Sequence, residues 1–174
     1  VKTQKNLNKL WTMTVNKVYL KTLLLNDFNW FVRYFFKQRY GRKLQNVAHV
    51  KVLCKFLQDC IDGNIQNLII NIAPGFSKSM VGGEFLIPFA MARNSQAKNI
   101  ILSYGQTVSQ KTSQAAKSIM TLPAYQELFP QTFQIAENAK GFWRNEHGGG
   151  LLATSAGGAV TGHDAGSISS DPDG

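Results

Sequence analysis

The amino-acid sequence predicts an α/β domain in which helices flank a mostly parallel sheet. Two short apolar segments with β-branched residues, 67–72 (NLIINI) and 99–103 (NIILS), are each followed by a segment of helical character. Strands that alternate with helices are typical of parallel sheets. The chain of 174 residues, 44% hydrophobic and 17% charged, is long enough for one domain with its own core.

Helices are predicted ahead of the first strand. The aromatic-rich segment 20–40 predicts one or two helices that close at Gly41. From residue 47 to residue 62, apolar residues recur at spacings of three and four, which predicts a half-buried helix that ends at Gly63.

Helices are also predicted after each strand. The chain has helical character from Lys78 onward, and Gly82, Gly83 and Pro88 are expected to kink or end this helix before Arg93. Residues 106–121 predict an amphipathic helix, whose inward side chains would be Val108, Thr112, Ala115, Ala116 and Ile119. Beyond Pro130 the sequence indicates short strands and turns, in TFQIAENA, GFWRNE and GGGLLATSAGGAVTG.

Positive charge is concentrated in the N-terminal third. Residues 1–55 hold twelve Lys or Arg against one acid, Asp27, whereas the remaining 119 residues hold seven bases and nine acids. This excess indicates either attraction to a polyanion or a solvated charged face, and we weigh the two equally. The aromatics interleaved in FNWFVRYFFKQRYGRK favour nucleic-acid binding somewhat, although most of them are expected in the core.

Cysteine and histidine spacing gives no indication of a structural metal site. Cys54 and Cys60 are expected to be buried, reduced thiols, and His49, His147 and His163 are far apart in sequence. No apolar stretch is long enough to span a membrane and no secretory signal is recognisable, so we expect a cytoplasmic protein. The chain begins with Val and stops at DPDG, and we expect it to be cut at both ends.

The stretch 67–80, NLIINIAPGFSKSM, has the order of a phosphate-binding loop: an apolar run, a Pro-Gly turn, then Lys78 and Ser79. Such a loop works because backbone N–H groups and the N-terminus of the next helix converge on an anion. Measured against G-x-x-x-x-G-K-[ST], however, Ile72 and Ser77 stand where the motif has glycine. Taken alone, the stretch fits a nucleotide site and a plain strand-turn-helix equally well.

Several blocks, in order along most of the chain, resemble the large terminase subunits of tailed bacteriophages. NLIINIAPGFSKSM is similar to their Walker A segment, and the other blocks are FVRYFFKQRYGRK, VAHVKVLCKFLQDCIDGNIQNLIINI, AKNIILSYGQTVSQKTSQAAKSIM, LPAYQELFP and GGGLLATSAGGAVTG. The resemblance implies a P-loop NTPase fold. Residues 1–45 would be a basic, aromatic-rich helical segment and residues 46–174 a partial ATPase domain, without the nuclease domain of the family.

The resemblance also implies roles for single residues. Lys78 would be the catalytic lysine at the β and γ phosphates of ATP, Ser79 the hydroxyl that binds Mg²⁺, and the backbone cradle would be formed by Pro74, Gly75, Phe76 and Ser77. Such proteins use ATP hydrolysis to drive double-stranded DNA into a procapsid. They work as a homo-oligomeric ring on the portal protein, with a small terminase subunit, in the cytoplasm of the infected bacterium and transiently on the procapsid; no membrane is involved.

The acids of Walker B are expected just beyond Gly174, with Asp171 as the less favoured candidate inside the chain. The full-length protein would then be the ATPase, and this chain alone would hold phosphates but hydrolyse ATP poorly or not at all. Glu84 and Glu137 as a base, and Arg93 and Arg144 as an arginine finger, are weaker hypotheses than surface, capping or paired roles. His49 near the adenine is likewise weaker than a core or capping histidine.

Two other functions fit the sequence. One is a non-catalytic, basic nucleic-acid-binding or scaffold module, in which the stretch 67–80 is only structural. The other is a helicase-like translocase, against which the Gly-rich block LLATSAGGAVTG favours the terminase.

Overall fold

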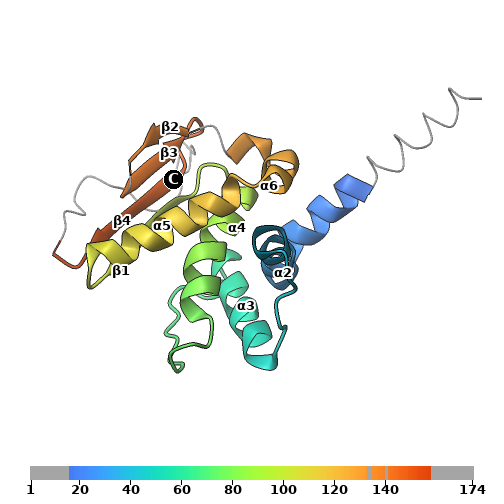
Figure 1. Ribbon diagram of the computed structural model, residues 1–174, viewed down its shortest axis with the longest axis horizontal. Coiled ribbons are helices and arrows are strands. Elements are labelled where there is room, and N and C mark those ends of the chain that lie inside the picture. The colour runs from blue at the N-terminus through green and yellow to red at the C-terminus, as the bar shows by residue number, and fades with distance from the viewer. Residues whose placement is uncertain (1–15, 133–134, 140, 158–174) are drawn as a thin grey trace, which may run out of the picture.

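The computed structural model describes residues 16–132, 135–139 and 141–157, with the side chains of 135–138 excepted. Residues 16–26 are helical. The labelled elements are α2 (Phe28–Tyr40), α3 (Ala48–Ile61), a π-helix η1 (Met80–Phe85), α4 (Leu86–Arg93), β1 (Lys98–Ser103), α5 (Gln106–Met120), α6 (Pro123–Leu128), a 3₁₀ turn η2 (Pro130–Thr132), β2 (Ile135–Asn138), β3 (Phe142–Asn145) and β4 (Gly150–Ser155) (Figure 1).

The strands form one mixed sheet, so the prediction of a mostly parallel sheet was wrong. The strand order is β1-β4-β3-β2, and only β1 and β4 run parallel. Strands β2, β3 and β4 follow one another through short connections, which permit antiparallel pairing alone, whereas a parallel pair needs a long crossover. The turn before β4 is held by Asn145, whose side-chain oxygen accepts hydrogen bonds from the N–H groups of His147 (3.0 Å) and Gly149 (2.9 Å).

The predicted buried strand at residues 67–72 is not a strand. In the described part of the chain this segment pairs with no other strand, and the side chains of Ile69 and Ile70 are 94% and 38% exposed. β-Branched residues favour a strand only where a neighbouring strand supplies hydrogen bonds and packing. Only Leu68 in this segment packs against the core.

The helical half of the core is built from aromatic side chains, as the sequence predicted. Phe28, Phe31 and Phe35 of α2 are fully buried. They pack on Phe89 of α4 and on Tyr125 and Phe129 at α6, with ring centroids 4.8–6.3 Å apart. The Tyr125 hydroxyl donates to the carbonyl of Pro88 (2.8 Å), and burial raises its pKa. Helix α2 is therefore fixed to α4 and α6.

Helix α5 lies between the sheet and the other helices (Figure 1). Its buried face includes Ala116 and Ile119, as predicted, but Val108 is 58% exposed, which contradicts the prediction for that residue. The small polar side chains of Ser109 and Ser113 are buried instead. They permit close approach to the sheet, and the Ser113 hydroxyl accepts a hydrogen bond from the indole N–H of buried Trp143 (3.1 Å).

Across the described ranges, no helix has both the length and the apolar character needed to cross a bilayer. Neither cysteine in these ranges is in a disulfide: Cys54 is buried, as expected, and Cys60 is only half-buried. Burial raises the pKa of the Cys54 thiol to about 11. A cluster of side chains able to hold a metal ion is absent from the described residues.

Candidate phosphate-binding loop

The loop between residue 72 and the following helix contains two residues with left-handed backbone, although its sequence lacks the two glycines of the motif. Gly75 has a φ of 86° and Ser77 a φ of 62°. Ser77 therefore adopts the left-handed conformation at the position where the motif has its second glycine, and the helical backbone starts at the next residue, Lys78. A left-handed residue beside a right-handed one turns successive N–H groups toward the same side, which is how backbone nests bind anions.

The side chain of Lys78 closes the loop. Its ammonium group donates a hydrogen bond to the carbonyl oxygen of Ile72 (3.2 Å), so that the two ends of the loop are joined across six residues. An ammonium group has three donors, and this is the one hydrogen bond of the Lys78 side chain in the described part of the chain. The remaining donors leave the lysine able to bind an anion held in the loop.

The start of the helix presents further donors. The N–H of Val81 bonds to the carbonyl of Ser77 (2.9 Å), which opens the helix at Lys78. The N–H groups ahead of this bond have no partner within the helix, and the positive end of the helix dipole lies at the loop. Ser79 is exposed, and its hydroxyl forms no hydrogen bond within the described residues. A serine hydroxyl can be the one protein ligand of a magnesium ion whose other ligands are phosphate oxygens and water.

The helix that leaves the loop is continuous from Lys78 to Arg93, whereas Gly82, Gly83 and Pro88 were expected to kink or end it before Arg93; its first part is irregular instead. Residues Met80–Phe85 form the π-helix η1, and Pro88, which has no N–H to contribute, lies in the first turn of α4. A Cβ on Gly83 would lie 2.7 Å from the Thr112 methyl carbon, so η1 approaches α5 closely at this glycine. Single π-turns inside helices are frequent at functional sites.

A cavity of about 740 Å³ adjoins the loop. One wall is formed by Gly75, Phe76 and Ser77, and the other by the segment that leads into α3, while Phe36, Val50 and Met80 also line it. This volume lies in the range of small-molecule sites. The loop is therefore not a flat surface turn but one side of a ligand-sized space.

The cavity carries positive charge. Arg42 and Lys43 line it and are exposed, and no acidic side chain is among its described lining residues. An anion in the cavity would be attracted by these cations as well as by the loop. The sequence offers no local signal that Arg42 and Lys43 meet the loop, which lies about thirty residues further along the chain.

His49 and Phe76 form an aromatic wall of this cavity. Their ring centroids are 5.0 Å apart with the rings edge to face, and Phe76 is 45% exposed. His49 is half-buried in the first turn of α3. It therefore lies next to the loop, and it is a packed side chain at a helix start.

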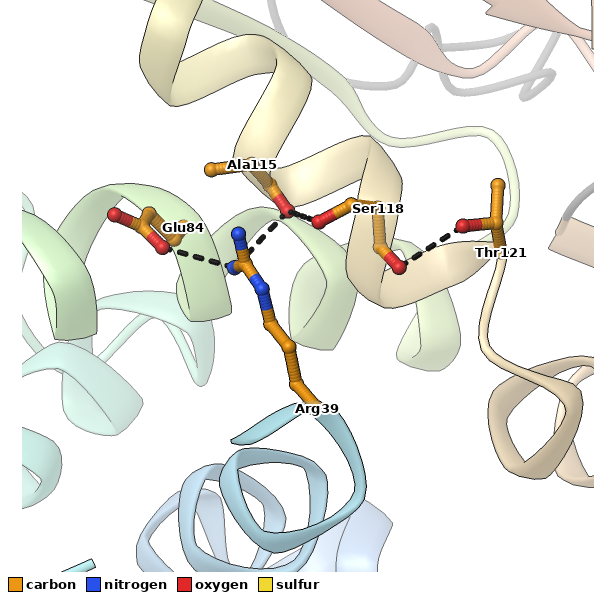
Figure 2. Close-up of polar contacts among 5 residues, drawn as sticks. All are labelled: Arg39, Glu84, Ala115, Ser118 and Thr121. Carbon is orange, nitrogen blue, oxygen red and sulfur yellow. Dashed lines mark hydrogen bonds and ion pairs between the residues drawn. The ribbon is translucent and has the colours of Figure 1, made fainter. Parts of the chain in front are cut away.

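Glu84, a candidate base, is engaged in structural contacts (Figure 2). Its carboxylate pairs with the guanidinium of Arg39 (2.9 Å), which also donates to the carbonyl of Ala115 (3.4 Å). The same carbonyl accepts a hydrogen bond from the Ser118 hydroxyl (2.7 Å). Arg39 thus joins α2, η1 and α5, a role for which the sequence offers no local signal because the partners are 45 and 76 residues away.

The other candidate residues lie apart from the loop contacts. Arg93 pairs with Asp62, which agrees with a structurally paired arginine. Arg144 is exposed, with its guanidinium carbon 5.4 Å from the centre of the Phe142 ring. The side chain of Glu137 and the whole of Asp171 lie outside the described residues.

Comparisons with protein-family models, with curated proteins and with solved structures each returned no match. The geometry of the loop and the cavity is therefore the structural ground for a functional proposal.

Proposed function

We propose that this chain is the ATP-binding motor domain of a phage terminase large subunit, which uses ATP hydrolysis to translocate double-stranded DNA into a procapsid. The observation that supports it most is the left-handed backbone of Ser77 directly before Lys78. A non-glycine residue rarely adopts this conformation, and here it occurs at the motif position that glycine normally occupies. The ordered resemblance to terminases supports the proposal independently.

In this proposal the loop holds the phosphates of ATP. The backbone N–H groups of residues 74–77 cradle the phosphate oxygens, and Lys78 exchanges its bond to the Ile72 carbonyl for the β and γ phosphates. Ser79 holds Mg²⁺, which when bound neutralises charge on these phosphates. Arg42 and Lys43 add positive potential to the adjoining cavity. Hydrolysis also requires the acidic side chains of a Walker B segment.

The partners belong to the same proposal. Basic side chains of the N-terminal helices would contact DNA phosphates, so that DNA binding is nonspecific and weakens with salt. The portal protein, a small terminase subunit and further copies of the chain in a ring are the partners that the resemblance implies. The site of action would be the cytoplasm of an infected bacterium and the surface of the procapsid.

The test is calorimetric titration of MgATP into the chain, into Lys78→Ala and into Lys111→Ala. Lys111 is an exposed lysine on α5 that does not line the cavity, so it controls for the loss of one positive charge. We expect wild type and Lys111→Ala to bind equally and Lys78→Ala to show no binding, with unchanged urea midpoints. Absence of binding by the wild-type chain, or equal binding by Lys78→Ala, would contradict the proposal.

A second candidate function is a non-catalytic nucleic-acid-binding or scaffold module. It is favoured by residues 67–72, which do not form the supporting strand that a phosphate-binding loop normally follows. This candidate predicts salt-sensitive binding of duplex DNA that is unaffected by Lys78→Ala, together with no heat of MgATP binding. A helicase-like translocase, the remaining alternative, would bind MgATP and separate strands, whereas a terminase motor moves an intact duplex.

A further inference from the structure

A second, smaller cavity lies between the first helix and α2. It has a volume of about 260 Å³, and its apolar walls are Leu20, Leu23 and Leu24 from residues 16–26 and Trp30 and Tyr34 from α2. We call this cavity the leucine groove. It does not include any residue of the loop 74–77, but Lys43 and Leu44 line both cavities, so the leucine groove adjoins the cavity of the proposed phosphate site.

The rim of the leucine groove is cationic. Arg33, Lys37 and Lys43 line it, and no acid does so among its described lining residues. In the described part of the chain none of these three forms an ion pair, whereas Lys17 pairs with Glu127 and Arg39 with Glu84. The rim cations are therefore available to carboxylates from outside the chain.

Apolar surface continues beyond the groove. Trp30 is 43% exposed, with the Arg33 guanidinium carbon 4.4 Å from its ring centre, and Tyr19, one turn before Leu23, is 70% exposed. Both side chains are thus accessible, and the helix of residues 16–26 lies at the right-hand edge of the ribbon in Figure 1. Aromatic side chains and arginine beside an apolar pocket are the residue types that dominate protein–protein binding energy.

We propose that the leucine groove is a docking site for an acidic amphipathic segment of a partner protein. One large apolar side chain of the partner enters the groove, and flanking carboxylates pair with Arg33, Lys37 and Lys43. The small volume and the leucine lining suit a single apolar side chain, and the unpaired cations select acidic neighbours over basic ones. A nucleic acid, in contrast, would meet the rim cations but leave the apolar cavity empty.

The probe is a fluorescein-labelled amphipathic peptide of about 16 residues, with leucine at helical spacings of three and four and glutamate at the flanking positions. Binding to the full chain is followed by anisotropy, together with a peptide in which lysine replaces every glutamate. We expect saturable, salt-sensitive binding of the acidic peptide, and binding of the lysine peptide weaker by at least about tenfold.

Matched variants locate the binding. Arg33→Glu/Lys37→Glu reverses two charges at the rim, and Lys51→Glu/Lys111→Glu makes the same change in net charge at exposed sites outside both cavities. We expect the first pair to weaken acidic-peptide binding by at least about tenfold and to leave MgATP binding unchanged. The second pair should bind the peptide like wild type, and Leu23→Asn should weaken it without charge change.

Three results would overturn the proposal. The first is no binding of the acidic peptide, and the second is equal weakening by the two double variants, which would reduce the effect to net charge. The third is binding of a duplex of about 20 base pairs that is lost in Arg33→Glu/Lys37→Glu while Leu23→Asn binds peptide and duplex like wild type, which would identify a nucleic-acid surface instead. Urea midpoints of all variants report whether each one folds.

Discussion

Replacing Ser77 by glycine is expected to stabilise the protein. Ser77 has a φ of 62°, and left-handed backbone costs a residue with a Cβ about 1–2 kcal/mol of stability, because the Cβ lies too close to the following carbonyl oxygen. Glycine removes this penalty, but it also gives the unfolded chain more freedom, which costs about 0.4–1 kcal/mol. The Ser77 hydroxyl forms no hydrogen bond within the described residues, so removing it should not change the free energy of unfolding. The net gain should be about 0.5–1 kcal/mol.

The matched control is Ser79→Gly, the same substitution two residues later. Ser79 has right-handed backbone, with φ −70° and ψ −34°, so glycine there brings no relief and costs about 0.5 kcal/mol of helix propensity. Urea unfolding followed by circular dichroism should therefore show opposite signs for the two variants. In a thermal scan Ser77→Gly should raise Tm by about 1–4 °C.

The reasoning would be refuted if Ser77→Gly lost stability, or if Ser77→Gly and Ser79→Gly changed the free energy of unfolding equally. Either result would mean that the backbone at residue 77 is not left-handed in solution. MgATP binding by Ser77→Gly should equal that of wild type or exceed it, because glycine is the residue that the motif has at this position.

Three further outcomes are expected. Gly150→Ala should destabilise the sheet by about 1–3 kcal/mol, since its Cβ would lie 2.3 Å from a carbonyl oxygen of β3, whereas Gly157→Ala, with nothing within 4 Å, should change stability little; equal urea midpoints would contradict this. A double-mutant cycle of Arg39→Ala and Glu84→Ala should give a coupling of about 1 kcal/mol, because the pair is three-quarters buried, and a coupling of zero would show that it does not hold η1. Burial raises the pKa of Cys54 to about 11 from 9.0, so its thiol favours the folded state less as pH rises from 9.0 to about 11; unfolding free energies at about pH 8 and pH 10.5 should therefore fall less for Cys54→Ala than for wild type.

Local patterns were sufficient for most helices and strands. The spacing of apolar residues predicted α3 and α5 nearly to their observed ends, and Gly41, with a φ of 67°, ends α2 as expected. These elements depend on interactions within a few residues, such as hydrogen bonds to the next turn and capping. A single sequence contains that information directly.

The candidate site was predicted only in part. The Pro-Gly turn and Lys78-Ser79 identified the loop. Serine at position 77, where the motif has glycine, argued against a phosphate-binding loop, and only the backbone conformation of Ser77 removes this objection. The cavity wall formed by Arg42 and Lys43, and the partner of Glu84, join segments that are distant in sequence. No periodicity or spacing encodes such contacts.

Side-chain periodicity and turn chemistry were enough to predict α3 and α5, the aromatic core helix α2 and the residues of the loop, but not the strand expected at residues 67–72. The mixed sheet, and the position of residues 67–72 outside it with Ile69 exposed, followed only from contacts between distant segments in the folded chain. Strand pairing requires hydrogen bonds from another segment, and local propensity does not specify which segment supplies them. Left-handed backbone is also unfavourable for an isolated serine, so at Ser77 the surrounding structure must stabilise it.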